Sequence, residues 1–184
     1  MTAVYIAIGT VAVLLLSLIL LYNGLVRARN TVDESWSGVD VQLKRRHDLV
    51  GNLIESVKGY AAHERATLQA VTDARAAAVL AGGPAGAARA EAALDGPVGA
   101  LMAIAEAYPD LKASENFMQL QNELSDLETQ IAASRRIYNG NVRAYNDRIQ
   151  SFPGMLVARP FGFSAREYFE IDAAEIAAPV VTVS

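Results

Sequence analysis

The chain has no cysteine and only two histidines among its 184 residues. The lack of cysteine excludes a disulfide-stapled scaffold and any chemistry that depends on a thiolate. It is compatible with a reducing cytoplasm, although many proteins of oxidising compartments also lack cysteine. Basic residues show no excess either, because 16 Lys and Arg stand among 20 Asp and Glu for a net charge of −4. Since nucleic-acid binders carry a strongly basic face, we predict no nucleic-acid partner.

The two histidines lack the spacing of a metal site. A di-iron bundle needs Glu-x-x-His pairs on two helices, but Lys44 stands three residues before His47 and Tyr60 three before His63. The two histidines would also lie about 24 Å apart along one straight helix. We interpret both as solvated or hydrogen-bonded side chains. No nucleophile elbow, P-loop or dinucleotide motif occurs. We therefore predict no catalytic residue, no metal, no cofactor and no enzymatic activity.

Charge is absent between Ala3 and Tyr22. A bilayer core of about 30 Å needs about 20 apolar helical residues, so residues 1–24 are predicted to be an N-terminal stub and a transmembrane helix, with the lipid bilayer as partner. A cleaved signal peptide is the alternative. It would need a basic start, a shorter apolar core and a small-residue cleavage site, and the sequence offers none of these.

Arginine at positions 27 and 29 follows the span, and no basic side chain precedes it. The positive-inside rule then predicts a translocated N-terminus and a cytoplasmic body, held by a single pass in the cell inner (plasma) membrane.

Apolar residues recur every three or four positions after the span, which is typical of long helices that pack together. No proline interrupts residues 26–82, so one helix could continue from the span, or bend at Asn23-Gly24, Gly38, Gly51 or Gly59. Glycines and Pro84 are expected to form a loop over residues 80–86. The apolar residues after the span form what we call the first stripe, and Arg46 and Glu64 occupy two of its positions. Its apolar members are Val32, Trp36, Val39, Leu43, Val50, Leu53, Val57, Tyr60, Leu68 and Val71.

Beyond that loop, a helix over 87–94 is expected to break at Asp95-Gly96-Pro97 and to resume over 98–107. The last stripe runs from Phe117 to Phe152 and predicts a helix that Pro153-Gly154 ends. The expected fold is all-α: the transmembrane helix, then an antiparallel bundle over residues 25–153 of two long helices plus one or two short ones. Residues 154–184 are predicted to form an aromatic loop and an irregular or partly extended tail.

Polar landmarks spread over most of the chain resemble the LemA family. They are Tyr22-Asn23, Arg29-Asn30, Trp36-Ser37, residues 41–50, Asn52-Leu53, residues 57–64, residues 106–113, Arg135-Arg136, Tyr138-Asn139, Tyr145-Asn146, Phe152-Pro153 and residues 161–163. The resemblance implies one amino-terminal membrane helix, a small cytoplasmic helical bundle, no established enzymatic activity and a likeness to proteins of magnetosome membranes. Two places depart from the family pattern: Gly51 stands where proline is usual, and residues 95–97 interrupt a stretch that is usually helical.

Two groups of residues are candidates for interaction. The basic cluster Lys44, Arg45 and Arg46 could bind anionic headgroups or an acidic partner. The alternative is ion pairing within the bundle, with Asp40 and Asp48 four residues from Lys44 and with Glu123 or Glu128 opposite Arg46. The aromatics Phe161, Phe163 and Phe169 could either cap the bundle end or form an exposed patch. Trp36, Tyr60, Tyr138 and Tyr145 are expected in the core.

Three functions remain. The leading hypothesis is a membrane-anchored scaffold without catalysis, which forms a homo-oligomer or organises other membrane proteins. The alternative is an adaptor or signalling subunit of a larger membrane complex. An enzyme or metal-binding bundle ranks below both.

Overall fold

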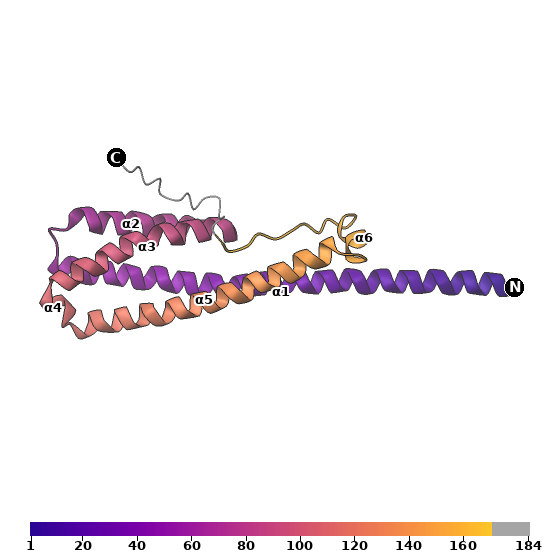
Figure 1. Cartoon of the computed structure of the whole chain (residues 1–184), viewed down its shortest axis with the longest axis horizontal. Coiled ribbons are helices and arrows are strands. Elements are labelled where there is room, and N and C mark those ends of the chain that lie inside the picture. The colour runs from indigo at the N-terminus through magenta and orange to yellow at the C-terminus, as the bar shows by residue number, and fades with distance from the viewer. Residues whose placement is uncertain (171–184) are drawn as a thin grey trace, which may run out of the picture. The chain divides into compact units, whose positions relative to one another are not determined.

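A computed structural model describes residues 1–170, and within them every regular element is a helix (Figure 1). The helices are α1 (Thr2–Tyr60), α2 (Arg65–Leu80), α3 (Gly83–Ala107), α4 (Pro109–Lys112), α5 (Glu115–Gln150) and α6 (Gly154–Ala158). This confirms the all-α class. Residues 171–184 of the predicted tail lie outside the described residues.

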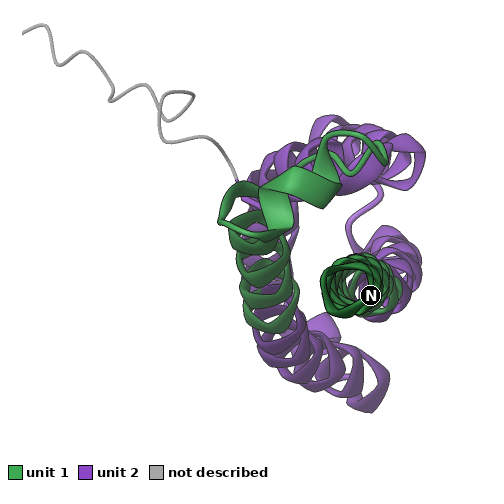
Figure 2. Ribbon diagram, turned by 90° about the vertical axis from the view of Figure 1, so that its right-hand side faces the viewer, with its two compact units in different colours: residues 1–37, 136–167 green, residues 38–135, 168–184 purple. Residues whose placement is uncertain are grey.

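The chain forms two compact units (Figure 2). Unit 1 combines residues 1–37 with residues 136–167. Unit 2 combines residues 38–135 with the segment that begins at Tyr168. Helices α1 and α5 each contribute one part to each unit.

The first part of α1 carries the apolar span. It has the length and composition to cross a membrane, and none of its most apolar window is buried against the rest of the protein. The hydroxyls of Thr10 and Ser17 donate to the carbonyl oxygens of Ile6 and Val13 at 2.9 and 2.8 Å. These bonds leave no side-chain donor unsatisfied in lipid. The helix passes Asn23-Gly24 without a break.

The rest of unit 1 packs the end of α5 against α1. Tyr138 and Tyr145 are buried as predicted, and the ring of Tyr138 lies 5.3 Å from that of Trp36. The tyrosine hydroxyls donate to the carbonyl oxygens of Glu167 and Ser164 at 2.8 and 3.0 Å. The extended segment after α6 is therefore held along α5 by hydrogen bonds to buried side chains.

A second set of polar contacts holds the same segment. The side-chain amide of Asn146 donates to the carbonyl of Arg166 and accepts from its backbone N–H, at 3.0 and 2.9 Å. The guanidinium of Arg166 pairs with Asp33 of α1 at 2.8 Å.

Unit 2 is an antiparallel helical bundle, as the sequence predicts. Its four long stretches are residues 38–60 of α1, α2, α3 and residues 115–135 of α5, joined by short connections. The one-turn helix α4 connects α3 to α5. The core side chains include Val39, Leu43, Val50, Leu53, Val57, Val71, Leu94, Leu101, Leu111, Phe117, Leu124 and Leu127.

The sequence allowed either one helix to residue 82 or a bend at one of several glycines, and the structure breaks the helix directly after Gly59-Tyr60. Helix α1 ends at Tyr60, and the N–H of Glu64 bonds to the carbonyl of Ala61 in the reversal that precedes α2. Ala61 is buried in this turn, whereas Tyr60 is exposed instead of in the core. Because the chain reverses here, the alanine-rich helix α2 packs along α3 instead of extending the first stripe.

The predicted break at Asp95-Gly96-Pro97 is also wrong, because α3 runs through Pro97 from Gly83 to Ala107. A proline inside a helix costs about 3 kcal/mol. Leu94, Val98 and Leu101 lie on one face of α3 and are all buried. Burial of three such side chains contributes roughly 5–9 kcal/mol, which exceeds the cost of the proline. The last apolar stripe was predicted to run to Phe152. Phe152 instead lies beyond the end of α5 and is exposed, so the stripe ends at Ile149.

Candidate functional site

A cluster of buried charged side chains lies in unit 2. Arg46 of α1 is 6% exposed, and its neighbour His47 and Glu91 of α3 are each 7% exposed. The Arg46 guanidinium places Nη1 2.5 Å from Oε2 of Glu91 and Nη2 2.6 Å from Oδ1 of Asp95. The other Glu91 oxygen lies 2.5 Å from Nε2 of His47. Together with Glu128 of α5, these residues form what we call the Arg46 cluster.

The helices explain why the cluster forms. Arg46 occupies a position of the apolar stripe, so α1 directs it into the bundle. Glu91 and Asp95 are four residues apart on α3 and therefore share a face. Glu128 completes the set, with Oε1 2.8 Å from Arg46 Nε. That nitrogen makes no hydrogen bond of acceptable geometry, so we treat its contact with Glu128 as coulombic.

The pKa shifts follow from burial and pairing. Burial alone would lower the pKa of Arg46, but hydrogen bonds to Asp95 and Glu91 outweigh it and raise the pKa. Burial would raise the pKa of Glu91, but hydrogen bonds from His47 and Arg46 outweigh it and lower the pKa. Burial raises the pKa of Glu128 more than the charge of Arg46 lowers it. The best-paired carboxylate, Glu91, is thus held ionised.

A second arginine supports the same part of α1. Arg75 of α2 donates its Nε–H to the carbonyl oxygen of His47 at 2.5 Å. Its guanidinium lies so close to Gly51 that a Cβ there would stand 3.2 Å from Nη2. The absence of a side chain at Gly51 therefore lets α2 approach α1 closely at this level.

The Arg46 cluster borders a cavity of about 160 Å³, which Ile131, Arg135 and Phe169 also line. Sites for drug-sized molecules usually enclose about 300–1,000 Å³, so this cavity is smaller than such a site. The described residues hold no group of three or more His, Asp and Glu side chains arranged for a metal ion. Because Arg46 and Glu91 neutralise each other, the arrangement is suited to fixing the register of α1, α3 and α5 rather than to acid–base chemistry.

The residues of the predicted basic cluster lie in different surroundings. Lys44 is exposed and pairs with Asp40 at 2.6 Å, as its spacing indicates. Arg45 is exposed. Two acids, Glu123 and Glu128, were predicted as partners of Arg46. Glu128 pairs with it, whereas Glu123 accepts a hydrogen bond from Gln119. Asp48 lies 4.0 Å from Arg75 instead of pairing with Lys44.

Sequence reasoning missed the α3 half of the cluster and the role of His47. Glu91 was expected in a helix over 87–94 and Asp95 in the break that follows it, so their common face on one helix was not recognised. A signal was present, since a charged residue on an apolar stripe needs partners of opposite charge when it is buried. Three carboxylates within reach of one arginine satisfy that need.

The predicted aromatic group is divided between the units. Phe169 belongs to unit 2, where it is buried. Phe161 and Phe163 belong to unit 1, and their rings meet the edge of Tyr22 at 5.1 and 5.6 Å. The guanidinium of Arg29 lies 5.4 Å from the ring centre of Phe163. These contacts bring the segment after α6 to the end of the apolar span.

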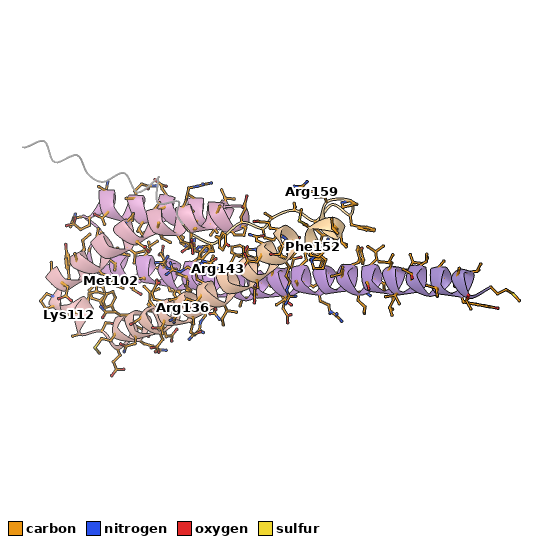
Figure 3. All side chains as sticks on the ribbon, turned by 45° about the vertical axis from the view of Figure 1, so that its right-hand side comes forward. Met102, Lys112, Arg136, Arg143, Phe152 and Arg159 are labelled. Atoms are coloured by element: carbon orange, nitrogen blue, oxygen red, sulfur yellow. The ribbon has the colours of Figure 1, made fainter. Side chains whose placement is uncertain are left out.

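An apolar groove lies beside these rings in unit 1. It has a volume of about 250 Å³. Leu20, Leu21 and Leu25 of α1 line it together with Phe152 and Pro153, which follow the end of α5. Figure 3 labels Phe152 at this junction.

Comparison with known proteins finds relatives over most of the chain. The chain is 28% identical to the magnetosome protein MamQ of Magnetospirillum gryphiswaldense, over 83% of this chain and 66% of that protein. It is 27% identical to magnetosome protein MamQ 2 of Paramagnetospirillum magneticum, over 90% and 70% of the two chains. It is 29% identical to protein LemA of Metamycoplasma hominis, over 84% and 74%.

The chain thus spans about two thirds of the length of the magnetosome relatives that it matches. A family model also matches most of this sequence. It matches residues 35–183, which include both the Arg46 cluster and the aromatic segment after α6. The chain belongs to the LemA family.

Proposed function

We propose that this protein is a single-pass, membrane-anchored helical scaffold that has no catalytic activity and organises membrane or partner proteins through self-association. The observation that carries the proposal is the apolar window of α1, which is long enough to span a bilayer and is not buried by the rest of the protein. A core helix of a soluble protein would be covered. This helix leaves its apolar surface available to lipid.

Charge supports the proposed orientation in the inner membrane. Unit 1 carries seven arginines against four acidic residues, whereas the whole chain has a net charge of −4. Its basic excess therefore lies in the unit that contains the span. Under the positive-inside rule, this favours a cytoplasmic body and a translocated N-terminus.

A scaffold also fits the Arg46 cluster and the relatives. Buried ion pairs add little net stability but can specify how helices align, which a rigid interaction surface requires. Two of the relatives are named as magnetosome proteins, which supports a role in organising a membrane. These points favour assembly over chemistry.

Cysteine labelling tests the anchor and its orientation, because the chain has no native cysteine. Thr2→Cys should react with a membrane-impermeant maleimide in spheroplasts. Leu80→Cys, at an exposed position of unit 2, should react only after lysis. The reverse pattern would refute the orientation, and recovery of the intact chain in a lysate cleared of membranes would refute the anchor.

Light scattering of the full chain in detergent tests self-association. A self-associating scaffold should have a protein mass of at least twice the 19.6 kDa of one chain. A monomer at micromolar concentration would remove self-assembly. It would leave the alternative of an adaptor or signalling subunit, which should instead co-purify with a larger membrane complex at fixed stoichiometry.

A further inference from the structure

Unit 1 exposes large apolar side chains beyond the end of α5. Phe152 is 78% exposed, Leu156 of α6 is 60% exposed and Phe161 is 54% exposed. These side chains carry no polar group, so their exposure to water is not offset by hydrogen bonds. A cluster of this kind on a protein surface usually marks a contact with another molecule or with a membrane.

The cluster lies at the level where the apolar span ends. Phe152 shares its groove with Leu20 and Leu21, which are among the last residues of the span. Phe161 touches Tyr22, the final residue of the span, with ring centres 5.1 Å apart. Since a helix rises 1.5 Å per residue, Phe152 and Phe161 lie within about one helical turn of the end of the span. The headgroup layer is roughly 5–7 Å thick on each side of the hydrocarbon, so both rings fall within it.

The charges around the cluster complement anionic lipid. Arg27 and Arg29 follow the span, Arg148 lines the groove, and Arg159 ends α6. Figure 3 shows Arg159 and Phe152 at this end of unit 1. Aromatic and arginine side chains together are the composition found at membrane interfaces, where rings lie among the headgroups and guanidinium groups pair with phosphate.

We infer that residues 151–163, which contain α6, dock into the headgroup layer of the bilayer that holds the span. The occupant of the exposed apolar surface is then lipid, with anionic headgroups paired to the arginines beside it. This inference rests on the proposed anchoring of the first helix. It adds a second membrane contact that fixes the body against the bilayer, where a single helix alone would leave it free to pivot.

The test uses tryptophan quenching in the full-length chain. The sequence has one tryptophan, so Trp36→Phe supplies a background into which single tryptophans are placed. Phe152→Trp reports on the proposed contact. Leu14→Trp, within the span, reports on the anchor. Ile137→Trp is the matched control, because Ile137 is 62% exposed and belongs to the same unit, but it lies on α5 about 20 Å before the end of the helix that Phe152 follows.

Each variant is reconstituted in vesicles of phosphatidylcholine and phosphatidylglycerol whose acyl chains are brominated either near the glycerol or near the chain end. We expect the emission of Phe152→Trp to fall with bromine near the glycerol, and to fall less with bromine at the chain end. Leu14→Trp should be quenched by both lipids. Ile137→Trp should keep its emission in both.

The possible failures are distinguishable. If Leu14→Trp is quenched but Phe152→Trp behaves like Ile137→Trp, the interface contact is refuted and the anchor stands. If Leu14→Trp is not quenched, both the anchor and the contact are refuted. A blue-shifted Phe152→Trp emission that bromine does not quench, and that shifts to the red on dilution into excess lipid, would assign the surface to a second copy of the chain and also refute the inference.

Discussion

Replacement of Arg46 by methionine should strongly destabilise unit 2. The change keeps the length and apolar character of the side chain but removes the cation that Glu91, Asp95 and Glu128 share. Glu91 would keep its hydrogen bond from His47 and lose the guanidinium 2.5 Å away. Removal of one partner of a buried ion pair costs about 3–5 kcal/mol. The side chains of Arg46 and Glu91 are 7% and 9% exposed, so little of this is screened by solvent.

The contacts with Asp95 and Glu128 add little to that figure, because these side chains are 65% and 45% exposed. Pairs of this exposure contribute about 0–1 kcal/mol each. The predicted loss is therefore dominated by Glu91. A change of about 3–5 kcal/mol corresponds to a fall in melting temperature of roughly 6–20 °C for a protein of about 150–250 residues, and to a larger fall for a smaller unit.

The assay is unfolding of the full chain in detergent by guanidinium chloride, with the helix content followed by circular dichroism. Arg45→Met is the matched control, since it is the same substitution at the exposed neighbouring position, and should change stability by no more than about 0.5 kcal/mol. The double variant Arg46→Met/Glu91→Gln should regain roughly 1–3 kcal/mol relative to Arg46→Met alone. Additive losses, or a stable Arg46→Met, would refute the assignment.

Acid provides an independent check. The pKa of Glu91 is lowered from 4.5 in the folded protein, so its pairing contributes stability above that pH and the contribution is lost as the pH falls through the folded pKa. Arg46→Met lacks this contribution at every pH. The difference between wild type and variant should therefore be largest at neutral pH and should shrink on acidification below 4.5. A difference that grows with acid would contradict the argument.

Three further changes test other parts of the fold. Leu124→Asp should unfold unit 2, because an unpaired charge would enter the core at a cost of several kcal/mol, and an unchanged melting curve would refute the placement of α5. Tyr138→Phe removes the hydrogen bond to the Glu167 carbonyl and should cost about 0.5–1.5 kcal/mol in denaturant unfolding. Burial raises the pKa of Tyr138 from 10.0 to about 12, so the wild type should lose stability as the pH rises through this range while Tyr138→Phe loses less. Gly154→Ala should destabilise unit 1 by about 1–3 kcal/mol, since its Cβ would overlap the carbonyl oxygen of Arg148, and equal melting temperatures would contradict that packing.

The long helices could be predicted because their information is local. The three–four spacing of α5 from Phe117 to Ile149 is a property of adjacent turns, and each position of this stripe is buried or half-buried, as expected for one face of a helix. Tyr138 and Tyr145 follow from the same pattern. A stripe of this kind determines both the element and the side that it buries.

The errors arose where distant residues decide the outcome. Nothing in Ala61-Ala62-His63-Glu64 forbids a helix, so the reversal there depends on the packing of α2 against α3. Pro97 is a strong local signal against a helix, yet the buried residues around it outweigh that signal. The Arg46 cluster has the same origin. Its charged partners come from α3 and α5, which sequence spacing alone does not bring together.

The two units differ in net charge, and the proposed membrane contact and the Arg46 cluster belong to different units. Unit 1 has a net charge of +3, from seven arginines and four acids, whereas unit 2 has nine basic and sixteen acidic residues and a net charge of −7. Anionic lipid attracts the first and repels the second. A perturbation of the Arg46 cluster should therefore leave lipid contact by residues 151–163 intact. In Arg46→Met, we expect the quenching of Phe152→Trp to persist at denaturant concentrations that unfold unit 2. Simultaneous loss of both signals would show that the register of the bundle also positions the membrane contact.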